Sequence, residues 1–450
     1  MYPPRITRYL IHPLLCRVNG YYRRMRTLGR DLERSEWWAT EQLMDLQVQK
    51  LRTLLEEARR YSPYYKQLLQ QAGLDPTHAT HRDLAGLPSL DKSSLRTQFE
   101  EIVSRRYERD RLIQCSSGGS TGEPVHVLRS GEITPMLGAI TERGYRWAGW
   151  FPGASHHKFW GAPMDVEAGT DSWRKRFIKE VYNKELVNAF MASEALFESY
   201  HVRHRSRPPA LFESYADILY EFARYIEAQR LPFFGAAAIV SSAGTLHDFQ
   251  RKLIVRTVGR EIFNRYGCRE VGNVAQECEA HGGMHINMER YIVEILNPDA
   301  EGVGELLITD LDNLAFPLVR YRIGDLGKLA SEPCACGRGL VVLERVVGRT
   351  LDVIVTPDGR RISGVLFPRV FRDYPQIVLG QVIQNSLTEV EVRLRLQGNM
   401  TEDELAQLLE RLRGAMGPEV AVKINFDAEI VVTPTGKYRT VISQLGGASA

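Results

Sequence analysis

Apolar residues recur every three or four positions along residues 37–72, which is the spacing of one buried face of a helix. The periodic positions are Trp37, Leu43, Leu46, Leu51, Leu54, Leu55 and Ala58. Pro63 falls inside this run, and a proline within a helix removes a backbone hydrogen bond. We therefore expect one helix to end there and a short second helix to follow. Residues 87–92 are typical of a loop that leads into another helix, with Asp91 as its N-cap.

A different pattern begins near residue 111. Short apolar runs, such as those at 237–240 and 305–309, alternate with helical stretches up to about residue 310. Alternation of this kind predicts an α/β body.

The pattern changes again after residue 348. Residues 389–394 alternate as in a strand, residues 402–412 have helical spacing, and residues 420–426 are strand-like again. This combination predicts a small α+β domain at the C-terminal end. We therefore expect three regions, namely a helical N-terminal region, an α/β body and a small C-terminal domain, over residues 1–110, 111–347 and 348–450.

Length and composition exclude several classes of protein. A chain of 450 residues suggests two or three domains. A net charge of +3 lacks the strong basic bias that nucleic-acid binding normally needs. Six cysteines are too few for a disulfide scaffold, so a reducing compartment, the cytoplasm, is the simpler expectation. No apolar run approaches the roughly 20 residues that a transmembrane helix needs.

The first thirty residues are strongly basic, and the first acidic residue is Asp31. The arginines are Arg5, Arg8, Arg17, Arg23, Arg24, Arg26 and Arg30, with apolar residues among them. His12 and Pro13 interrupt the apolar part, and no small-residue cleavage site follows, which argues against a signal peptide. Two interpretations stay open: a basic arm packed on the body, or an amphipathic segment in peripheral contact with an anionic inner membrane face.

A loop rich in glycine and hydroxyl side chains occupies residues 115–125. Its candidate binding residues are Ser116, Ser117, Gly118, Gly119, Ser120, Thr121 and Gly122. Glycines let backbone N–H groups approach phosphate oxygens, and hydroxyls add neutral donors. No Gly-Lys-Ser/Thr sequence follows, so this is not a Walker loop. Taken alone, a Gly/Ser loop is more often only a flexible turn.

Four further motifs follow in order along the chain. They are Tyr266-Gly267-Cys268-Arg269-Glu270, Tyr321-Arg322-Ile323-Gly324-Asp325, Gly348-Arg349 and Pro434-Thr435-Gly436-Lys437. Together with the Gly/Ser loop, they resemble the ordered core motifs of the adenylate-forming superfamily, which holds acyl-CoA synthetases, adenylation domains of peptide synthetases and luciferases. The resemblance spans about residues 40–440. It is strongest to the phenylacetate–CoA ligase branch, which includes proteins of capsular polysaccharide clusters.

The resemblance implies a large N-terminal α/β domain with a small, mobile α+β C-terminal domain. It also implies roles for the motif residues of the large domain. The Gly/Ser loop would hold the β- and γ-phosphates of ATP, and Glu270 would bind Mg²⁺. Tyr266, followed by Gly267, would stack on adenine, and Asp325 would accept hydrogen bonds from the ribose hydroxyls. Taken singly, each side chain has an ordinary structural alternative, such as a core tyrosine or a turn aspartate.

Two implied residues lie at or beyond the domain junction. Arg349 would contact the nucleotide, and Lys437, in a polar loop after an expected strand at 429–432, would reach the α-phosphate and the substrate carboxylate. The sequence departs from the family pattern at Gly244, which follows Ala243 and stands where many relatives have a glutamate. It departs again at Leu351, where many relatives have an aspartate after the Gly-Arg arginine.

The implied activity is the Mg²⁺-dependent activation of a carboxylic acid by ATP to an acyl-AMP, with coenzyme A as the expected acceptor. Two alternatives stay open: transfer of the acyl or adenylyl group to another acceptor in polysaccharide biosynthesis, and a nucleotide-binding scaffold without catalysis. A Rossmann dehydrogenase is not supported, because no Gly-x-Gly-x-x-Gly with a following acid occurs.

A second constellation has the spacing of a metal site. Cys278-x-x-His281 and Cys334-x-Cys336 offer three thiolates and an imidazole, which suit a closed tetrahedral Zn²⁺ site of structural type. His285 is an alternative ligand. The competing interpretation is that Cys278 is a small buried apolar residue and that 334–336 is an ordinary loop.

Overall fold

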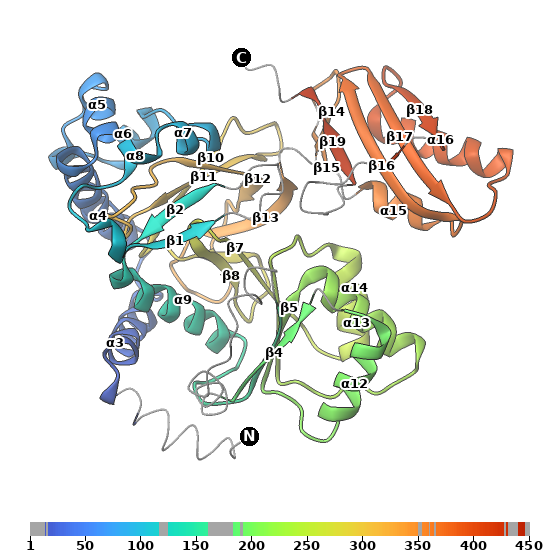
Figure 1. Cartoon of the computed structure of the whole chain (residues 1–450), viewed down its shortest axis with the longest axis horizontal. Helices are drawn as coiled ribbons and strands as arrows, with labels where there is room; N and C mark the ends of the chain where they lie inside the picture. Colours follow the sequence, from blue (N-terminus) through green and yellow to red (C-terminus); the bar gives the residue numbers. More distant parts are fainter. Residues whose placement is uncertain are drawn as a thin grey trace.

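The chain folds into a large α/β part and a smaller C-terminal part, seen in the computed structural model (Figure 1). The structure describes residue 14 and residues 17–116, 125–160, 183–189, 192–349, 353–359, 361–363, 366–426, 429–430 and 440–445. Among these residues, no helix combines the length and the apolar character needed to cross a bilayer.

Helices dominate the N-terminal region, as expected. They are α3 (Gly20–Ser35), α4 (Thr40–Tyr61), α5 (Pro63–Gln71), α6 (His81–Gly86), α7 (Lys92–Thr97) and α8 (Phe99–Ile102), with short 3₁₀ turns η2 (Pro76–His78) and η3 (Arg109–Arg111). The predicted break is confirmed, because Pro63 begins α5, where its missing N–H has no helical partner to lose. Asp91 caps α7 by accepting a hydrogen bond from the Ser94 N–H at 2.7 Å.

The large sheet has eleven strands among the described residues. These are β3 (His156–Trp160), β4 (Lys184–Asn188), β5 (Leu211–Tyr215), β6 (Ala238–Ser242), β7 (Phe263–Cys268), β8 (Gly272–Glu277), β9 (Met284–Ile286), β10 (Tyr291–Leu296), β11 (Gly304–Asp310), β12 (Tyr321–Leu329) and β13 (Val342–Arg349). Their order is β10-β11-β12-β13-β9-β8-β7-β6-β5-β3-β4. The strands from β7 to β4 pair in parallel, and all other pairs are antiparallel.

Helices cover the parallel strands because parallel connections need crossovers. The covering helices α12 (Glu194–His204), α13 (Ala216–Ala228) and α14 (Asp248–Val258) lie together on one side (Figure 1). An aromatic core that includes Phe159, Phe212 and Phe222 fills the space between them and the sheet. The remaining elements of this part are the hairpin β1 (Ile113–Ser116) and β2 (His126–Arg129), the turn η4 (Gly131–Ile133) and the helix α9 (Thr134–Trp147).

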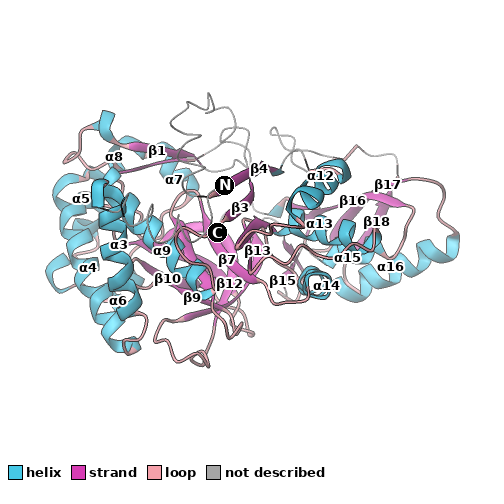
Figure 2. Cartoon of the chain, turned by 90° about the horizontal axis from the view of Figure 1, so that it is seen from below, coloured by secondary structure: helices cyan, strands magenta, loops and turns pink. Residues whose placement is uncertain are grey.

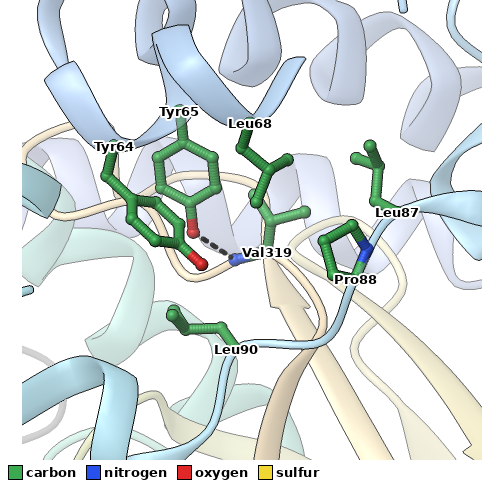
Figure 3. Close-up of a pocket in the computed structure, with 7 residues that line it drawn as sticks. All are labelled: Tyr64, Tyr65, Leu68, Leu87, Pro88, Leu90 and Val319. Carbon is green, nitrogen blue, oxygen red and sulfur yellow. Dashed lines mark hydrogen bonds between the residues drawn. The ribbon is translucent and has the colours of Figure 1, made fainter. Parts of the chain in front are cut away.

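The loop at 87–92 adds one bridge to the sheet. The Leu90 N–H donates to the Arg320 carbonyl at 3.1 Å, and the Arg322 N–H donates to the Leu90 carbonyl at 2.9 Å. Beside this bridge, the buried Tyr65 hydroxyl accepts from the Val319 N–H at 3.2 Å, within a narrow crevice between α5, the loop and the chain before β12 (Figure 3). The N-terminal helices are thus anchored to the start of β12.

The C-terminal part is a second, smaller sheet with two helices. Its elements are β14 (Val353–Val355), β15 (Arg361–Ser363), α15 (Leu366–Arg372), β16 (Ile377–Ser386), β17 (Glu389–Leu396), α16 (Glu402–Met416), β18 (Ala421–Asn425) and β19 (Val441–Ser443). The four-stranded order is β18-β17-β16-β19, with the two helices at this end of the molecule (Figure 2). The expected strand at 429–432 is wrong in its first half, because Glu429 and Ile430 are not in a strand, and residues 431–439 lie outside the described residues. The division into three regions stays a prediction.

Candidate functional site

Two of the predicted nucleotide-binding residues touch each other. Tyr266 lies on β7 and Asp325 on β12, and the Tyr266 hydroxyl donates to Asp325 Oδ2 at 2.8 Å. The two motifs that carry them are separated by more than fifty residues of sequence. The fold therefore joins them into one site, with an aromatic ring and a carboxylate side by side.

The sheet must curl strongly to allow this contact. Three strands, β13, β9 and β8, stand between β12 and β7 in the strand order. In a flat sheet, four strand spacings of about 4.8 Å would separate β12 from β7 by roughly 19 Å. A hydrogen bond of 2.8 Å across that interval requires the sheet to roll back on itself.

Glu270 lies in the turn between β7 and β8 and is almost fully buried, at 9 % exposed. Its Oε1 accepts from the Tyr321 hydroxyl at 3.3 Å, which joins the turn to the first residue of β12. The Tyr291 hydroxyl donates to the Val271 carbonyl at 2.6 Å and fixes the same turn from β10. A tyrosine of β12 thus contacts the Glu270 carboxylate, and a tyrosine of β10 holds the backbone of the next residue.

The ends of neighbouring strands complete the edge of the site. Ser242 pairs with Arg265 in the parallel register of β6 and β7, so Ala243 and Gly244 leave β6 close to where Tyr266 stands on β7. In open α/β sheets, ligands bind beyond the carboxyl ends of parallel strands. Ala243 has a positive φ of 57°, which turns the chain sharply after β6.

The β1–β2 hairpin brings the start of the Gly/Ser loop to the same region. Burial raises the pKa of Cys115 on β1, and the charges of Arg129, Arg269 and Glu270 also act on this thiol. Ser116 Oγ lies 2.8 Å from His126 Nδ1 across the hairpin. Of the predicted loop residues, Ser117, Gly118, Gly119, Ser120, Thr121 and Gly122 lie outside the described residues.

Of the predicted nucleotide-binding and catalytic residues beyond Asp325, the structure describes only the backbone of Arg349. The backbone of Arg349 pairs with Asp325 at the end of β13, so the Gly-Arg motif does approach the site, although nothing is described of its side chain. Lys437 and Leu351 lie outside the described residues, and their roles stay predictions.

Cys268 sits among the acidic groups of the site. Burial raises the pKa of this thiol well above its ordinary value, and the carboxylates of Glu270 and Asp325 raise it further. A raised pKa favours the protonated thiol, which is a poor nucleophile and a poor metal ligand.

A buried charged network lies on the opposite face of β7. Arg265, next to Tyr266, pairs with the fully buried Glu213 of β5, which also lies 3.0 Å from Lys158 Nζ and accepts from the Tyr145 hydroxyl at 2.6 Å. Burial alone would raise the pKa of Glu213, but the charges of Arg265 and Lys158 hold it well below its ordinary value. This network fixes β7 to β5, β3 and α9, and so fixes the backbone that carries Tyr266.

A cluster of three thiols and an imidazole joins β8, β9 and the connection between β12 and β13. Cys278 follows β8, His285 lies on β9, and Cys334 and Cys336 lie between β12 and β13; one ligand atom from each lies within 4.8 Å of the others. Cys278 Sγ is 3.8 Å from Cys334 Sγ, and Cys336 Sγ is 3.3 Å from His285 Nε2. A tetrahedral Zn²⁺ with Zn–S bonds of 2.3 Å separates two sulfurs by about 3.8 Å, so the cluster fits the metal.

The fourth predicted ligand needs correction. His281 is not part of this cluster, because its Nδ1 turns to Glu277 Oε2 at 3.3 Å. The alternative, His285, takes its place. Its Nδ1 lies 3.2 Å from the Leu340 carbonyl, which can only accept, so Nδ1 carries the proton and Nε2 presents its lone pair to the sulfurs.

Sequence reasoning assigned no role to Tyr321 or Tyr291. Tyr321 opens the motif that ends at Asp325, so the motif itself held a signal for it. Tyr291 carried no such signal, since only the curl of the sheet brings it to the Val271 carbonyl.

Replacing Gly267 tests whether the β7–β8 turn tolerates change. A Cβ on Gly267 would overlap the carbonyl oxygen of Gly272, which is backbone and cannot move aside, whereas a Cβ on Gly244 would meet only Ala216 Cβ at 3.6 Å. We expect Gly267→Ala to lower the free energy of unfolding by about 1–3 kcal/mol, as overpacking usually does. Gly244→Ala should change it by less than about 1 kcal/mol. Urea unfolding of both variants decides, and equal stability would show that the turn is not tightly packed.

The sequence is similar to those of known proteins. Residues 354–444 match the family model of the CapK C-terminal domain. The chain is 22% identical to Protein CapK of Staphylococcus aureus over 411 residues, covering 90% of each chain. It is 27% identical over 401 residues to a phenylacetate–coenzyme A ligase of Thermus thermophilus, covering 84% of each.

Solved structures share the fold. A 2-hydroxyisobutyryl-CoA ligase in its postadenylation state superposes with a TM-score of 0.70 at 16% identity, covering 92% of each chain. The same ligase in its thioesterification state gives a TM-score of 0.61 at 17% identity, covering 91% of each. The chain is thus similar in sequence to CapK and to phenylacetate–coenzyme A ligases, and it shares its fold with a solved acyl-CoA ligase.

Proposed function

We propose that this protein uses ATP and Mg²⁺ to activate a carboxylic acid as an acyl-AMP and then transfers the acyl group to coenzyme A. The observation that carries the proposal is that two distant motifs meet where the large sheet curls: Tyr266 bonds to Asp325, and the buried Glu270 accepts from Tyr321. Relatives named phenylacetate–coenzyme A ligase, with similar lengths, support the same reaction type.

In this proposal the adenosine end of ATP lies against Tyr266 and Asp325. The tyrosine ring offers a face for adenine, and the carboxylate accepts from the ribose hydroxyls. The hydrogen bond between these two side chains would pre-orient the carboxylate, so that little freedom is lost on binding.

The phosphates would extend from there toward Glu270 and the start of the Gly/Ser loop. The residues fit a magnesium site, because Mg²⁺ typically takes one or two carboxylates along with phosphate oxygens. Bound Mg²⁺ would neutralise phosphate charge as pyrophosphate departs. The Tyr321 hydroxyl would orient Glu270. Lys437 would approach from the C-terminal domain and stabilise the charge that develops between carboxylate and α-phosphate.

The acceptor separates this proposal from its rival. Relatives named coenzyme A ligases favour a thiol acceptor, and transfer to another acceptor in polysaccharide biosynthesis is the alternative that the sequence resemblance leaves open. Helix α3 exposes the arginines Arg23, Arg24, Arg26 and Arg30. We propose that these arginines make peripheral contact with an anionic membrane.

Pyrophosphate exchange tests the activation step. Over a panel of aryl, fatty and hydroxy acids, at least one acid should support Mg²⁺-dependent exchange of pyrophosphate into ATP. Glu270→Gln should slow this exchange on the order of a hundredfold, the effect of losing one transition-state charge contact. Glu261→Gln, which changes an exposed acid just before β7, should leave the rate unchanged.

Coenzyme A added to the same reaction should then yield a thioester. Exchange without any thioester would favour the non-CoA acceptor, and the absence of exchange with every acid would favour a nucleotide-binding scaffold. Exchange at the wild-type rate in Glu270→Gln would remove that residue from the mechanism.

We also propose that Cys278, His285, Cys334 and Cys336 hold a structural Zn²⁺. The sulfur–sulfur spacing of 3.8 Å and the lone pair of His285 Nε2 support it. The cluster joins the end of β8, the middle of β9 and the connection from β12 to β13, and β12 also carries Asp325. A metal there would act as a staple and take no part in the chemistry.

The two histidines give this metal site a matched test. His285→Gln and Cys336→Ser should each lose one zinc equivalent and lower the melting temperature, whereas His281→Gln should keep the metal. Zinc is measured by elemental analysis of protein without a polyhistidine tag, and a Co²⁺-loaded sample should show thiolate charge-transfer absorption. Loss of zinc in His281→Gln alone would show that His281 is the fourth ligand, as the sequence spacing predicts. A wild-type protein without cysteine-bound metal would show that residues 334–336 are an ordinary loop.

A further inference from the structure

Two histidines and a glutamate meet at the opposite end of the large sheet from β12. His157 lies on β3, Glu185 on the last strand in the order, β4, and His204 ends α12. His157 and Glu185 are direct partners in the parallel register of β3 and β4. Their side chains therefore leave the same face of the sheet, where α12 packs and brings His204 to them.

The three side chains converge on one point. One ligand atom from each lies within 4.8 Å of the other two. Glu185 Oε2 is 3.3 Å from His204 Nε2 and 3.8 Å from His157 Nε2. A tetrahedral metal with bonds of about 2.1 Å to nitrogen and oxygen separates its ligand atoms by about 3.4 Å. The distances match a three-ligand metal site.

Both imidazoles offer nitrogens that the protein does not otherwise use. His157 is 1 % exposed and His204 is 4 % exposed. Within the described part of the chain, neither Nε2 atom meets the geometry of a hydrogen bond, and the nearest charged group to each is Glu185 Oε2. Buried polar atoms are rarely left unpaired, so two such atoms facing one carboxylate oxygen indicate a shared ligand.

Neighbouring side chains would hold this arrangement in place. His157 Nδ1 lies 2.8 Å from the Tyr200 hydroxyl, so a proton on Nδ1 would be donated there and leave the Nε2 lone pair inward. Arg203 Nη1 donates to Glu185 Oε1 at 3.1 Å, which leaves Oε2 to face the two rings. Metal-binding histidines and carboxylates are commonly oriented in this way.

We propose that His157, Glu185 and His204 bind a divalent transition metal, best matched by Zn²⁺, with water in the fourth position. Two imidazoles and one carboxylate suit zinc, whereas Mg²⁺ and Ca²⁺ prefer all-oxygen sites. The metal would join the edge strand β4 to β3 and α12. This site is separate from the nucleotide site and from the cysteine cluster, and it does not depend on the ligase activity.

The proposal is tested by comparing the number of zinc ions per chain in the wild type with the number in each variant. Full-length protein without a polyhistidine tag is stripped with a chelator, saturated with Zn²⁺, freed of excess metal and analysed for metal content. Glu185→Gln and His204→Gln should each hold one equivalent less than wild type. His201→Gln changes another buried histidine of α12, one turn away and outside the group, and should hold as much as wild type.

A spectroscopic measurement on the wild type covers the case in which a variant fails to fold. Co²⁺ bound by His157, Glu185 and His204 should add visible d–d absorption without adding thiolate charge transfer, and Mg²⁺ should not compete for it. Equal zinc content in wild type, Glu185→Gln and His204→Gln would overturn the site. So would a wild type in which every bound Co²⁺ is thiolate-ligated, because the three residues would then be an ion-paired cluster only.

Discussion

The curl of the large sheet is the constraint on which the candidate site depends. β7 and β12 are four steps apart in the strand order, yet the Tyr266 hydroxyl bonds to Asp325 at 2.8 Å. Tyr321 and Tyr291 add two more hydroxyl bonds, to Glu270 and to the Val271 carbonyl, and these are also contacts between strands that are not neighbours. A flatter sheet would break all three bonds and disperse the site, because strand spacing is fixed by backbone hydrogen bonding.

The structure supports that curl with polar groups on both sides of the strands. Arg265 and Glu213 form a buried ion pair behind Tyr266. Removing one partner of such a pair strongly destabilises a protein, because the other charge is left buried and unpaired. Away from the candidate site, three cysteines and His285 gather three chain segments into one cluster. Rigid supports of this kind suit a site that must bind a charged ligand without reorganising.

The sequence predicts much of this fold because the signals are either local residue patterns or motifs that follow a fixed order along the chain. The break at Pro63, the cap at Asp91 and the α/β class follow from spacing, and the order of the five motifs predicts the resemblance that the relatives and the shared fold bear out. The choice between His281 and His285 was not predictable in this way. The Cys-x-x-His spacing favours His281, but His281 has a φ of 51° and turns to Glu277, while the pairing of β9 with β13 brings His285 to the thiols.

Long-range convergence explains the other gaps in the prediction. His157, Glu185 and His204 come from two strands and a helix with no common spacing, so no sequence motif marks them. The same holds for Tyr291, whose partner is a backbone carbonyl twenty residues away. Lys437, the predicted catalytic lysine, is the reverse case, since only its motif supports the role and the residue lies outside the described part of the chain.

The central claim is that the adenosine part of the nucleotide binds at the Tyr266–Asp325 contact. Calorimetric titration with AMP measures this directly, without the substrate acid or the C-terminal lysine. Replacing Asp325 by asparagine should weaken AMP binding roughly tenfold to a hundredfold, the usual range for one hydrogen bond to a charged group. Asp91→Asn, which changes a helix cap, should leave the affinity unaltered. Equal affinity in the wild type and Asp325→Asn would contradict the account, because the nucleotide would then bind elsewhere.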